Sequence, residues 1–355
     1  MSSKLTDVFA SHPLYLHQEH PDDFKSLHEL PDQYKWTRVH EYPSLDSPTL
    51  KSVTIIDLND PNAIQLIGHA CKTWGIFQVT NHGVPQKLVD DIESATRCLF
   101  TLPMEQKLKA ARPPTGFSGY GFHRISAFCE KLMWSEGFTI VGSPLEHFHQ
   151  LWPEDYLKFC SIFEEYEKEM KKLAERLMWL MLGSLGVFKE DVKWANPNSE
   201  LEAASAALQL NSYPACPNPD QAMGLVDHTD SNLLSIVHQG NISGLQVLRD
   251  GGWIMIPPIP SALVINVGDL IHILSNGLYH NVFHRAVVNR THHRVSVAYL
   301  YGPPISAEIS PLSKLVGPSH PPLYPSVTWK EYLGIKAKFN NKTLLSLRLD
   351  DTSPK

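Results

Sequence analysis

The chain has 355 residues, of which 43% are hydrophobic and 19% are charged, so it can bury a large core. This composition excludes a disordered or collagen-like chain. With 31 Lys and Arg residues against 37 Asp and Glu residues the net charge is −6, which argues against nucleic acid or an anionic membrane as the main partner.

The N-terminal part predicts alternating strands and helices. After an arm rich in Pro, His and charge, residues 53–58 (VTIIDL) predict a strand and residues 61–74 a helix. Residues 76–80 (IFQVT) predict a second strand, and residues 84–99 a second helix. This order indicates a mixed α/β segment.

A glycine-rich stretch follows at residues 112–125 and predicts a loop. It contains Gly119-Tyr120-Gly121, but the third glycine of a nucleotide-binding fingerprint is replaced by Arg124. We therefore interpret these glycines as turn residues.

The centre of the chain predicts a strand at residues 132–140 and a long helix that begins at Pro153. Apolar residues repeat along this helix at intervals of three and four, which is typical of a helix packed along a sheet. They are Tyr156, Phe159, Phe163, Tyr166, Met170, Leu173, Leu177 and Leu180.

From about residue 206 the period of the apolar pattern changes to two, and short strands alternate with turn residues. The predicted strands cover residues 206–213, 244–249, 253–257, 263–267, 282–288 and 294–301. Asp250-Gly251-Gly252 predicts a hairpin turn. Such short strands indicate a sandwich or barrel, and residues 328–345 predict a final helix.

Cysteine usage and hydropathy bear on location. The five cysteines are scattered and form no C-x-x-C pair, so we expect a reducing, cytoplasmic location without disulfides. No signal peptide is visible, and the most apolar stretch, residues 177–188, is shorter than the roughly 20 residues that a membrane span needs. Nothing in the sequence points to an obligate protein partner.

Polar pairs spaced i, i+2 interrupt the apolar strands of the C-terminal half. They are Asn211/Tyr213, His228/Asp230 and Arg294/Ser296. Side chains two apart on a strand share a face, and polar groups that face a β interior need a partner, a metal or a ligand.

One of these pairs predicts a metal site. His228 and Asp230, together with His284 from a later strand, supply two imidazoles and one carboxylate, the facial triad of non-haem Fe(II) enzymes, which leaves three coordination positions open. Arg294 and Ser296 follow ten residues after His284 and can bind a carboxylate. A zinc hydrolase with the same three ligands is an alternative, but it would leave Arg294 and Ser296 unexplained.

At these residues the chain resembles the plant 2-oxoglutarate- and Fe(II)-dependent dioxygenases. The resemblance runs through HACKTWGIFQVTNHGVP, LNSYPACP, HTDSNLLSIVHQ, NVGD and RVSVAYLYGP, and so covers nearly the whole chain. It implies an α+β fold with a double-stranded β-helix (jelly-roll) core, flanking helices and a mixed α/β N-terminal part. It implies Fe(II), 2-oxoglutarate and O₂ as cofactor and cosubstrates, with ascorbate as a candidate reductant.

The resemblance also implies roles and boundaries. His228, Asp230 and His284 would bind iron, Arg294 and Ser296 the distal carboxylate of 2-oxoglutarate, Tyr213 the same cosubstrate, and Asn211 the iron-side carboxylate or a water. Four parts are expected: an arm (1–50), an N-terminal domain with the long helix (51–200), the β-helix (201–310) and a C-terminal link and helix (311–355).

Within that family the chain is most similar to gibberellin 3-oxidases, through GFSGYGFHRISAF, KLMWSEGFTIVGSPL and SVTWKEYL. This likeness implies 3β-hydroxylation of a C19 gibberellin, a small diterpenoid substrate. Gibberellin 20-oxidases typically have H-C-D where this chain has His228-Thr229-Asp230. A gibberellin 2-oxidase, a flavonoid hydroxylase and a non-catalytic binding protein stay open as alternatives.

The substrate pocket should be apolar, with one or two partners for the substrate carboxylate. The candidates lie in the glycine-rich stretch, in the strand after it and in the last helix. They are His123, Arg124, Lys131, Trp134, Lys330 and Tyr332.

Overall fold

A computed structural model describes residues 5–13, 18, 20–37, 53–195 and 204–349. Its strands form a large sheet of order β1-β2-β10-β7-β12-β5-β4-β3, a smaller sheet of order β6-β11-β8-β9 and a two-stranded sheet of order β13-β14. The strands are β1 Ile55–Asp57, β2 Ile76–Thr80, β3 Gly119–Gly121, β4 Glu136–Ile140, β5 Ala206–Tyr213, β6 Leu225–His228, β7 Leu234–His238, β8 Leu245–Arg249, β9 Gly252–Met255, β10 Leu263–Val267, β11 His284–Ala286, β12 Arg294–Tyr301, β13 Glu308–Ile309 and β14 Val327–Thr328.

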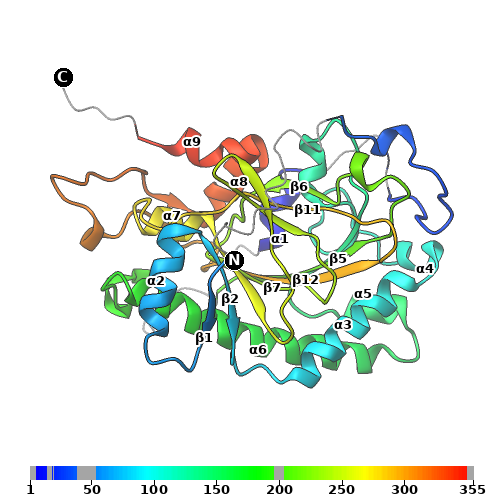
Figure 1. Ribbon diagram of the computed structural model, residues 1–355, viewed down its shortest axis with the longest axis horizontal. Helices are drawn as coiled ribbons and strands as arrows, with labels where there is room; N and C mark the ends of the chain where they lie inside the picture. The colour runs from blue at the N-terminus through cyan, green and yellow to red at the C-terminus, as the bar shows by residue number, and fades with distance from the viewer. Residues whose placement is uncertain (1–4, 14–17, 19, 38–52, 196–203, 350–355) are drawn as a thin grey trace.

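Helices surround these sheets (Figure 1). They are α1 Leu5–Ala10, α2 Ala63–Thr73, α3 Gln86–Thr101, α4 Met104–Leu108, α5 Leu145–Leu151, α6 Tyr156–Gly183, α7 Asp269–Leu274, α8 Trp329–Phe339 and α9 Thr343–Leu347. The antiparallel double sheet with flanking helices confirms the predicted jelly-roll class. No helix in the described ranges is both long enough and apolar enough to cross a membrane.

Helix α6 lies along the large sheet, as its apolar stripe predicts. It runs beneath the strands in Figure 1 and contacts β7 and β12. Phe163, Tyr166, Met170 and Leu177 are buried in the main core. The helix therefore covers one face of the large sheet, the sheet to which β5 and β12 also belong.

Strands β5 and β12 have the bounds that the period-two pattern predicts, and they pair antiparallel over their full length. The predicted hairpin is also confirmed, because β8 and β9 pair across Asp250 and Gly251, whose φ angles are +50° and +77°. Two central residues with positive φ are typical of a type I′ turn.

Several expectations were wrong in detail. Gly119–Gly121 is a strand at the edge of the large sheet, not a loop. The predicted strand at residues 132–140 begins only at Glu136. The last helix ends at Phe339 because Asn340 has φ +46°, and a separate helix, α9, follows.

Candidate active site

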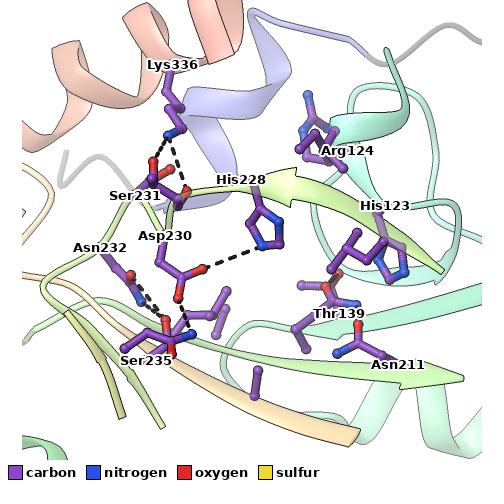
Figure 2. A pocket seen from close by; sticks show the side chains of 18 of the residues that line it. His123, Arg124, Thr139, Asn211, His228, Asp230, Ser231, Asn232, Ser235 and Lys336 are labelled. Atoms are coloured by element: carbon purple, nitrogen blue, oxygen red, sulfur yellow. Dashed lines mark hydrogen bonds and ion pairs between the residues drawn. The ribbon is translucent and has the colours of Figure 1, made fainter. Parts of the chain in front are cut away.

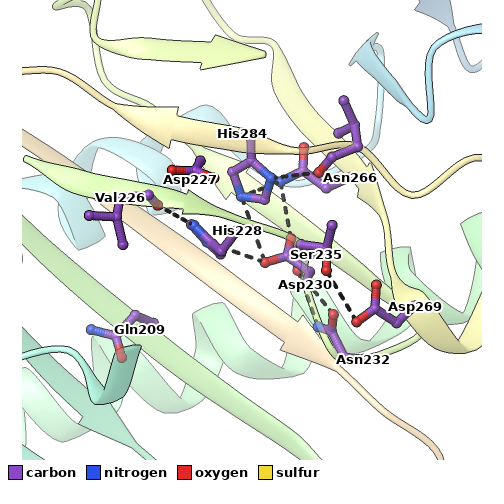
Figure 3. Close-up of polar contacts among 12 residues, drawn as sticks. Gln209, Val226, Asp227, His228, Asp230, Asn232, Ser235, Asn266, Asp269 and His284 are labelled. Carbon is purple, nitrogen blue, oxygen red and sulfur yellow. Dashed lines mark hydrogen bonds and ion pairs between the residues drawn. The ribbon is translucent and has the colours of Figure 1, made fainter. Parts of the chain in front are cut away.

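The smaller sheet brings His228 and His284 side by side, because they are direct partners in the antiparallel pairing of β6 with β11. Their ring centroids are 4.3 Å apart. The Nε2 atoms of His228 and His284 lie 3.8 and 3.7 Å from Oδ1 of Asp230. Figure 3 shows the three side chains pointing toward one another.

This spacing suits one metal ion. A first-row divalent ion with bonds of about 2.0–2.2 Å can be shared by atoms up to about 4.4 Å apart. The three side chains are the group of possible metal ligands found in the described residues, and the distances of 3.8 and 3.7 Å from the two Nε2 atoms to Asp230 lie within this limit. They offer two nitrogens and one oxygen on one side of the ion.

Backbone carbonyl groups orient both imidazoles. Nδ1 of His228 lies 2.8 Å from the carbonyl oxygen of Val226, and Nδ1 of His284 lies 3.2 Å from that of Val282. An Nδ1–H that donates to a carbonyl leaves Nε2 as the ring nitrogen that can bind a metal. Burial, together with the neighbouring His284, lowers the pKa of His228 to about 4, which favours the neutral imidazole that a metal needs.

Asp230 reaches the site from a turn and not from a strand. Strand β6 ends at His228, so the expectation that His228 and Asp230 share one face of a strand was wrong. The backbone N–H of Asp269 donates to the carbonyl oxygen of Asp230 at 2.8 Å, and Nδ2 of Asn266 donates to its Oδ2 at 3.1 Å. Burial by itself would raise the pKa of Asp230, but the two imidazoles and the hydrogen bonds of Ser235 and Asn266 keep it below its usual range.

The second polar group lies on the large sheet. Arg294 is paired with Tyr213 and Ser296 with Asn211 across β12 and β5, so these four side chains face the same cavity. All four are buried, and Arg294 is only 3% exposed. Nε of Arg294 donates to the carbonyl oxygen of Ile242 at 3.1 Å, and the guanidinium lies 5.0 Å from the centre of the Tyr213 ring. Within the described residues no carboxylate forms an ion pair with Arg294, so this buried cation is suited to an acidic ligand.

One cavity of about 500 Å³ joins both groups. This volume is within the range of small-molecule sites. Figure 2 shows His228 and Asp230 on one side of the cavity, His123, Thr139 and Asn211 on another, and Lys336 of α8 reaching in from a third direction. Apolar side chains line much of the remaining wall, among them Phe117, Ile125, Phe128, Val237, Leu300 and Leu333.

Of the six residues predicted to bind substrate, the structure brings only His123 and Arg124 to the cavity wall. Arg124 donates from Nη1 to the carbonyl oxygen of Gly116 at 3.0 Å and from Nη2 to that of His12. It therefore ties the segment after α1 to the glycine-rich segment.

The other four predicted residues do not line the cavity. Lys131 is half-buried and donates to the carbonyl oxygen of Asp32, and Trp134 packs against the rings of Phe24 and Tyr34. Lys330 is exposed on α8, and the buried hydroxyl of Tyr332 donates to Asp269 at 2.6 Å. Helical and strand spacing alone does not say which face of an element meets the cavity, so the sequence could not separate these four residues from those that line it.

The sequence interpretation missed several polar residues of the wall, namely Arg112, Thr139, Gln209 and Lys336. Gln209 could have been found, because it precedes Asn211 by two residues and so shares its face of β5. Arg112 and Lys336 carry no such signal, because Arg112 lies in an irregular segment and Lys336 is held by its bonds to Thr229 and to Asp269 of α7.

A buried network behind the triad fixes the turn that carries Asp230. The Asp269 carboxylate, 1% exposed as a side chain, accepts from Lys336 Nζ at 2.9 Å, from Tyr332 at 2.6 Å and from Asn281 at 2.6 Å. Lys336 also donates to the carbonyl oxygen and the hydroxyl of Thr229. Helix α8 is thus bonded to the residue between His228 and Asp230.

We predict that Asp269→Ala lowers the free energy of unfolding by about 3–5 kcal/mol, because it leaves the Lys336 ammonium and three further donors, on Tyr332, Asn281 and Thr229, without their acceptor. Urea denaturation of the metal-free protein measures this loss. The matched control is Asp91→Ala, which breaks the exposed ion pair with Lys87 on helix α3 and should change stability little. Equal losses in the two variants would contradict the importance of this network.

Comparison with known proteins agrees with this geometry. A model of the 2OG-Fe(II) oxygenase superfamily matches residues 204–303, and a model of the N-terminal domain described as non-haem dioxygenase in morphine synthesis matches residues 50–155. The crystal structure of JOX2 in complex with 2OG, Fe and JA superposes with a TM-score of 0.77 at 32% identity, covering 91% of this chain and 95% of that one. Fold and site together define a 2-oxoglutarate- and Fe(II)-dependent oxygenase.

Two relatives specify the family. Gibberellin 3-beta-dioxygenase 1 of Pisum sativum is 59% identical over 97% of this chain and 94% of its own length. Gibberellin 3-beta-dioxygenase 1 of Arabidopsis thaliana is 57% identical over 98% of this chain and 99% of its own length. The chain therefore belongs to the gibberellin 3-beta-dioxygenase family of plant oxygenases.

The residues present fit the cofactor and cosubstrates of this class, Fe(II), 2-oxoglutarate and O₂. The Nε2 atoms of both triad histidines and the Asp230 carboxylate offer the nitrogen and oxygen donors that Fe(II) takes. A buried arginine without an acidic partner, next to a serine hydroxyl, suits one carboxylate of a diacid.

Proposed function

We propose that this protein adds a 3β-hydroxyl group to a C19 gibberellin, using Fe(II), 2-oxoglutarate and O₂ and releasing succinate and CO₂. The observation that carries the proposal is the placement of the triad and the Arg294/Ser296 pair on facing sheets around one cavity. The likeness to gibberellin 3-beta-dioxygenases over nearly the whole chain supports the substrate.

In this proposal His228, Asp230 and His284 bind Fe(II), and Arg294 and Ser296 bind the distal carboxylate of 2-oxoglutarate. Fe(II) held by these residues would, together with 2-oxoglutarate and O₂, supply the oxidant that replaces a C–H bond by C–OH. Tyr213 covers one face of the Arg294 guanidinium, and Asn211 donates to the hydroxyl of Ser296 at 3.2 Å, so both fix the direction of the cosubstrate.

The apolar wall excludes water and holds the rigid substrate so that one C–H bond meets the metal side of the cavity. Positioning of this kind determines which carbon is hydroxylated, because the substrate itself does not bind the metal. We also propose a reducing compartment such as the cytoplasm, on the ground that all five cysteines are free.

The experiment incubates the purified protein with Fe(II), 2-oxoglutarate and separate C19 gibberellins, and identifies the products by mass spectrometry and NMR. We expect 3β-hydroxylated product and succinate in equal amounts. A 2β-hydroxylated product, or turnover of flavonoids in place of gibberellins, would contradict the proposed substrate and position. Activity with Zn²⁺ and without succinate would contradict the reaction class.

A further inference from the structure

Arg112 enters the cavity from the segment that precedes the edge strand β3. Its backbone N–H donates to the carbonyl oxygen of Tyr120 at 2.8 Å, and the N–H of Tyr120 donates to that of Ala110 at 2.8 Å. These bonds hold residues 110–112 against β3 and direct the Arg112 side chain to the cavity wall.

Gly119 makes this contact possible. Its φ is +117°, and a Cβ atom there would lie 2.8 Å from the carbonyl oxygen of Ala110 and 2.9 Å from the nitrogen of Arg112. Any larger residue would push the segment of Arg112 away from the sheet. Gly119, which does not belong to a nucleotide-binding motif, thus has a role in placing this arginine.

The Arg112 guanidinium has few partners and none that is acidic. Nη2 donates to the carbonyl oxygen of Phe122, and Nη1 lies 3.5 Å from the hydroxyl of Thr139. Of the charged groups in the described residues, the one that acts on it is another cation, Arg124; burial and this neighbour lower the pKa of Arg112 to about 10, so it stays charged at neutral pH. A cation in an apolar cavity without a counter-ion is costly unless a ligand supplies the negative charge.

His123 provides a second, independent feature beside this cation. The residue is 8% exposed and lines the cavity, and its Nε2 has no hydrogen-bond partner among the described residues. Its ring packs so closely on β4 that a Cβ atom on Gly137 would lie 2.9 Å from Cε1. Burial, Arg112 and His228 lower the pKa of His123 to about 3, so a neutral imidazole is available for one hydrogen bond to a ligand.

Arg112 and Arg294 belong to different parts of the cavity. Thr139 on β4, the neighbour of Arg112, pairs with Gln209 on β5. Gln209 in turn pairs with Ala298 on β12, and Ala298 lies four residues along that strand from Arg294. Two strand spacings and four residues along a strand separate the Cα atoms of Thr139 and Arg294 by about 16 Å. A five-carbon diacid bound at Arg294 and the triad therefore leaves Arg112 available for a different anion.

We propose that Arg112, with His123 beside it, binds the carboxylate of the diterpenoid substrate and so orients its ring system in the cavity. This inference rests on the proposed function, because it takes the substrate to be an apolar ring system with one carboxylate. The apolar wall contacts the rings, and the metal side of the cavity receives the carbon to be hydroxylated.

The test compares a gibberellin with its methyl ester, which has the same shape but no charge. In the wild-type protein we expect kcat/KM for the acid to exceed that for the ester by about 10- to 100-fold, the usual value of a charge-assisted hydrogen bond. Arg112→Gln should remove this preference while the KM for 2-oxoglutarate stays unchanged. Arg112→Lys keeps the charge and should keep part of the preference.

The matched control is Arg176→Gln, an arginine that donates to the carbonyl oxygen of Leu58 away from the cavity; it should keep the full preference. If Arg112→Gln does not fold, as its melting temperature will show, Arg112→Lys gives the answer. A wild-type protein that does not distinguish acid from ester, or a folded Arg112 variant with the full preference, overturns the inference but not the hydroxylase function. A wild-type protein that converts no gibberellin overturns both.

Discussion

Replacement of Asp230 by alanine is expected to abolish both iron binding and hydroxylation. The carboxylate lies 3.7–3.8 Å from the Nε2 atoms of His284 and His228 and supplies the one negative charge of the triad. Loss of a residue that merely supports a metal ligand typically costs 10- to 100-fold in affinity or activity, so loss of a ligand should cost more than about 100-fold. Iron content after gel filtration and succinate formation measure the two effects.

Asp227→Ala is the matched control, because Asp227 lies on the same strand, β6, but is exposed and does not line the cavity. It should retain iron and activity near the wild-type values. The ligand assignment would be refuted by an Asp230→Ala protein that kept its iron and its rate of hydroxylation.

Replacement of Arg294 by glutamine is expected to raise the KM for 2-oxoglutarate by about 10- to 150-fold, which corresponds to the roughly 1.5–3 kcal/mol of a hydrogen bond to a charged group. The reason is that Arg294 is buried and has no acidic partner in the part of the chain that the structure describes. Steady-state kinetics with 2-oxoglutarate as the varied substrate measure the change, and iron content should stay normal.

A second cosubstrate makes this test specific. With 2-oxobutanoate, which lacks the distal carboxylate, the wild-type protein and Arg294→Gln should be equally poor. Arg290→Gln serves as the control, because Arg290 is exposed between β11 and β12 and donates to the carbonyl oxygen of Pro217. If Arg294→Gln used 2-oxoglutarate as well as the wild type does, another residue would have to bind the distal carboxylate.

The pattern of apolar and polar residues was sufficient for prediction where the geometry of a single helix or strand decides which side chains share a face. The apolar stripe of α6 and the period-two pattern of β5 and β12 depend only on helix and strand geometry, and the structure confirms them. The same geometry put Asn211 with Tyr213 and Arg294 with Ser296 on one face, and the strand pairing then placed all four together.

The same pattern failed to predict where strands and helices end, because the backbone conformation there depends on contacts with residues far away in the chain. Strand geometry was the wrong reason for placing Asp230, because Asp230 lies in a turn that the backbone of Asp269 and the side chain of Asn266 hold in place. The predicted last helix continued through Asn340, where the backbone has positive φ and the helix ends.

The sequence by itself thus indicated the class of fold, the three residues of the triad and Arg294, because each belongs to a recognisable motif or to the period-two pattern of a strand. Only the tertiary structure decided which basic side chains and which imidazole line the cavity, since Arg112, His123 and Lys336 come from three separate segments. It also excluded Lys131 and Trp134, which lie next to the site in sequence but outside the cavity. The physical reason is that a cavity wall is formed by packing between elements, and the direction of a side chain across such a contact is fixed by neighbours far away in the chain.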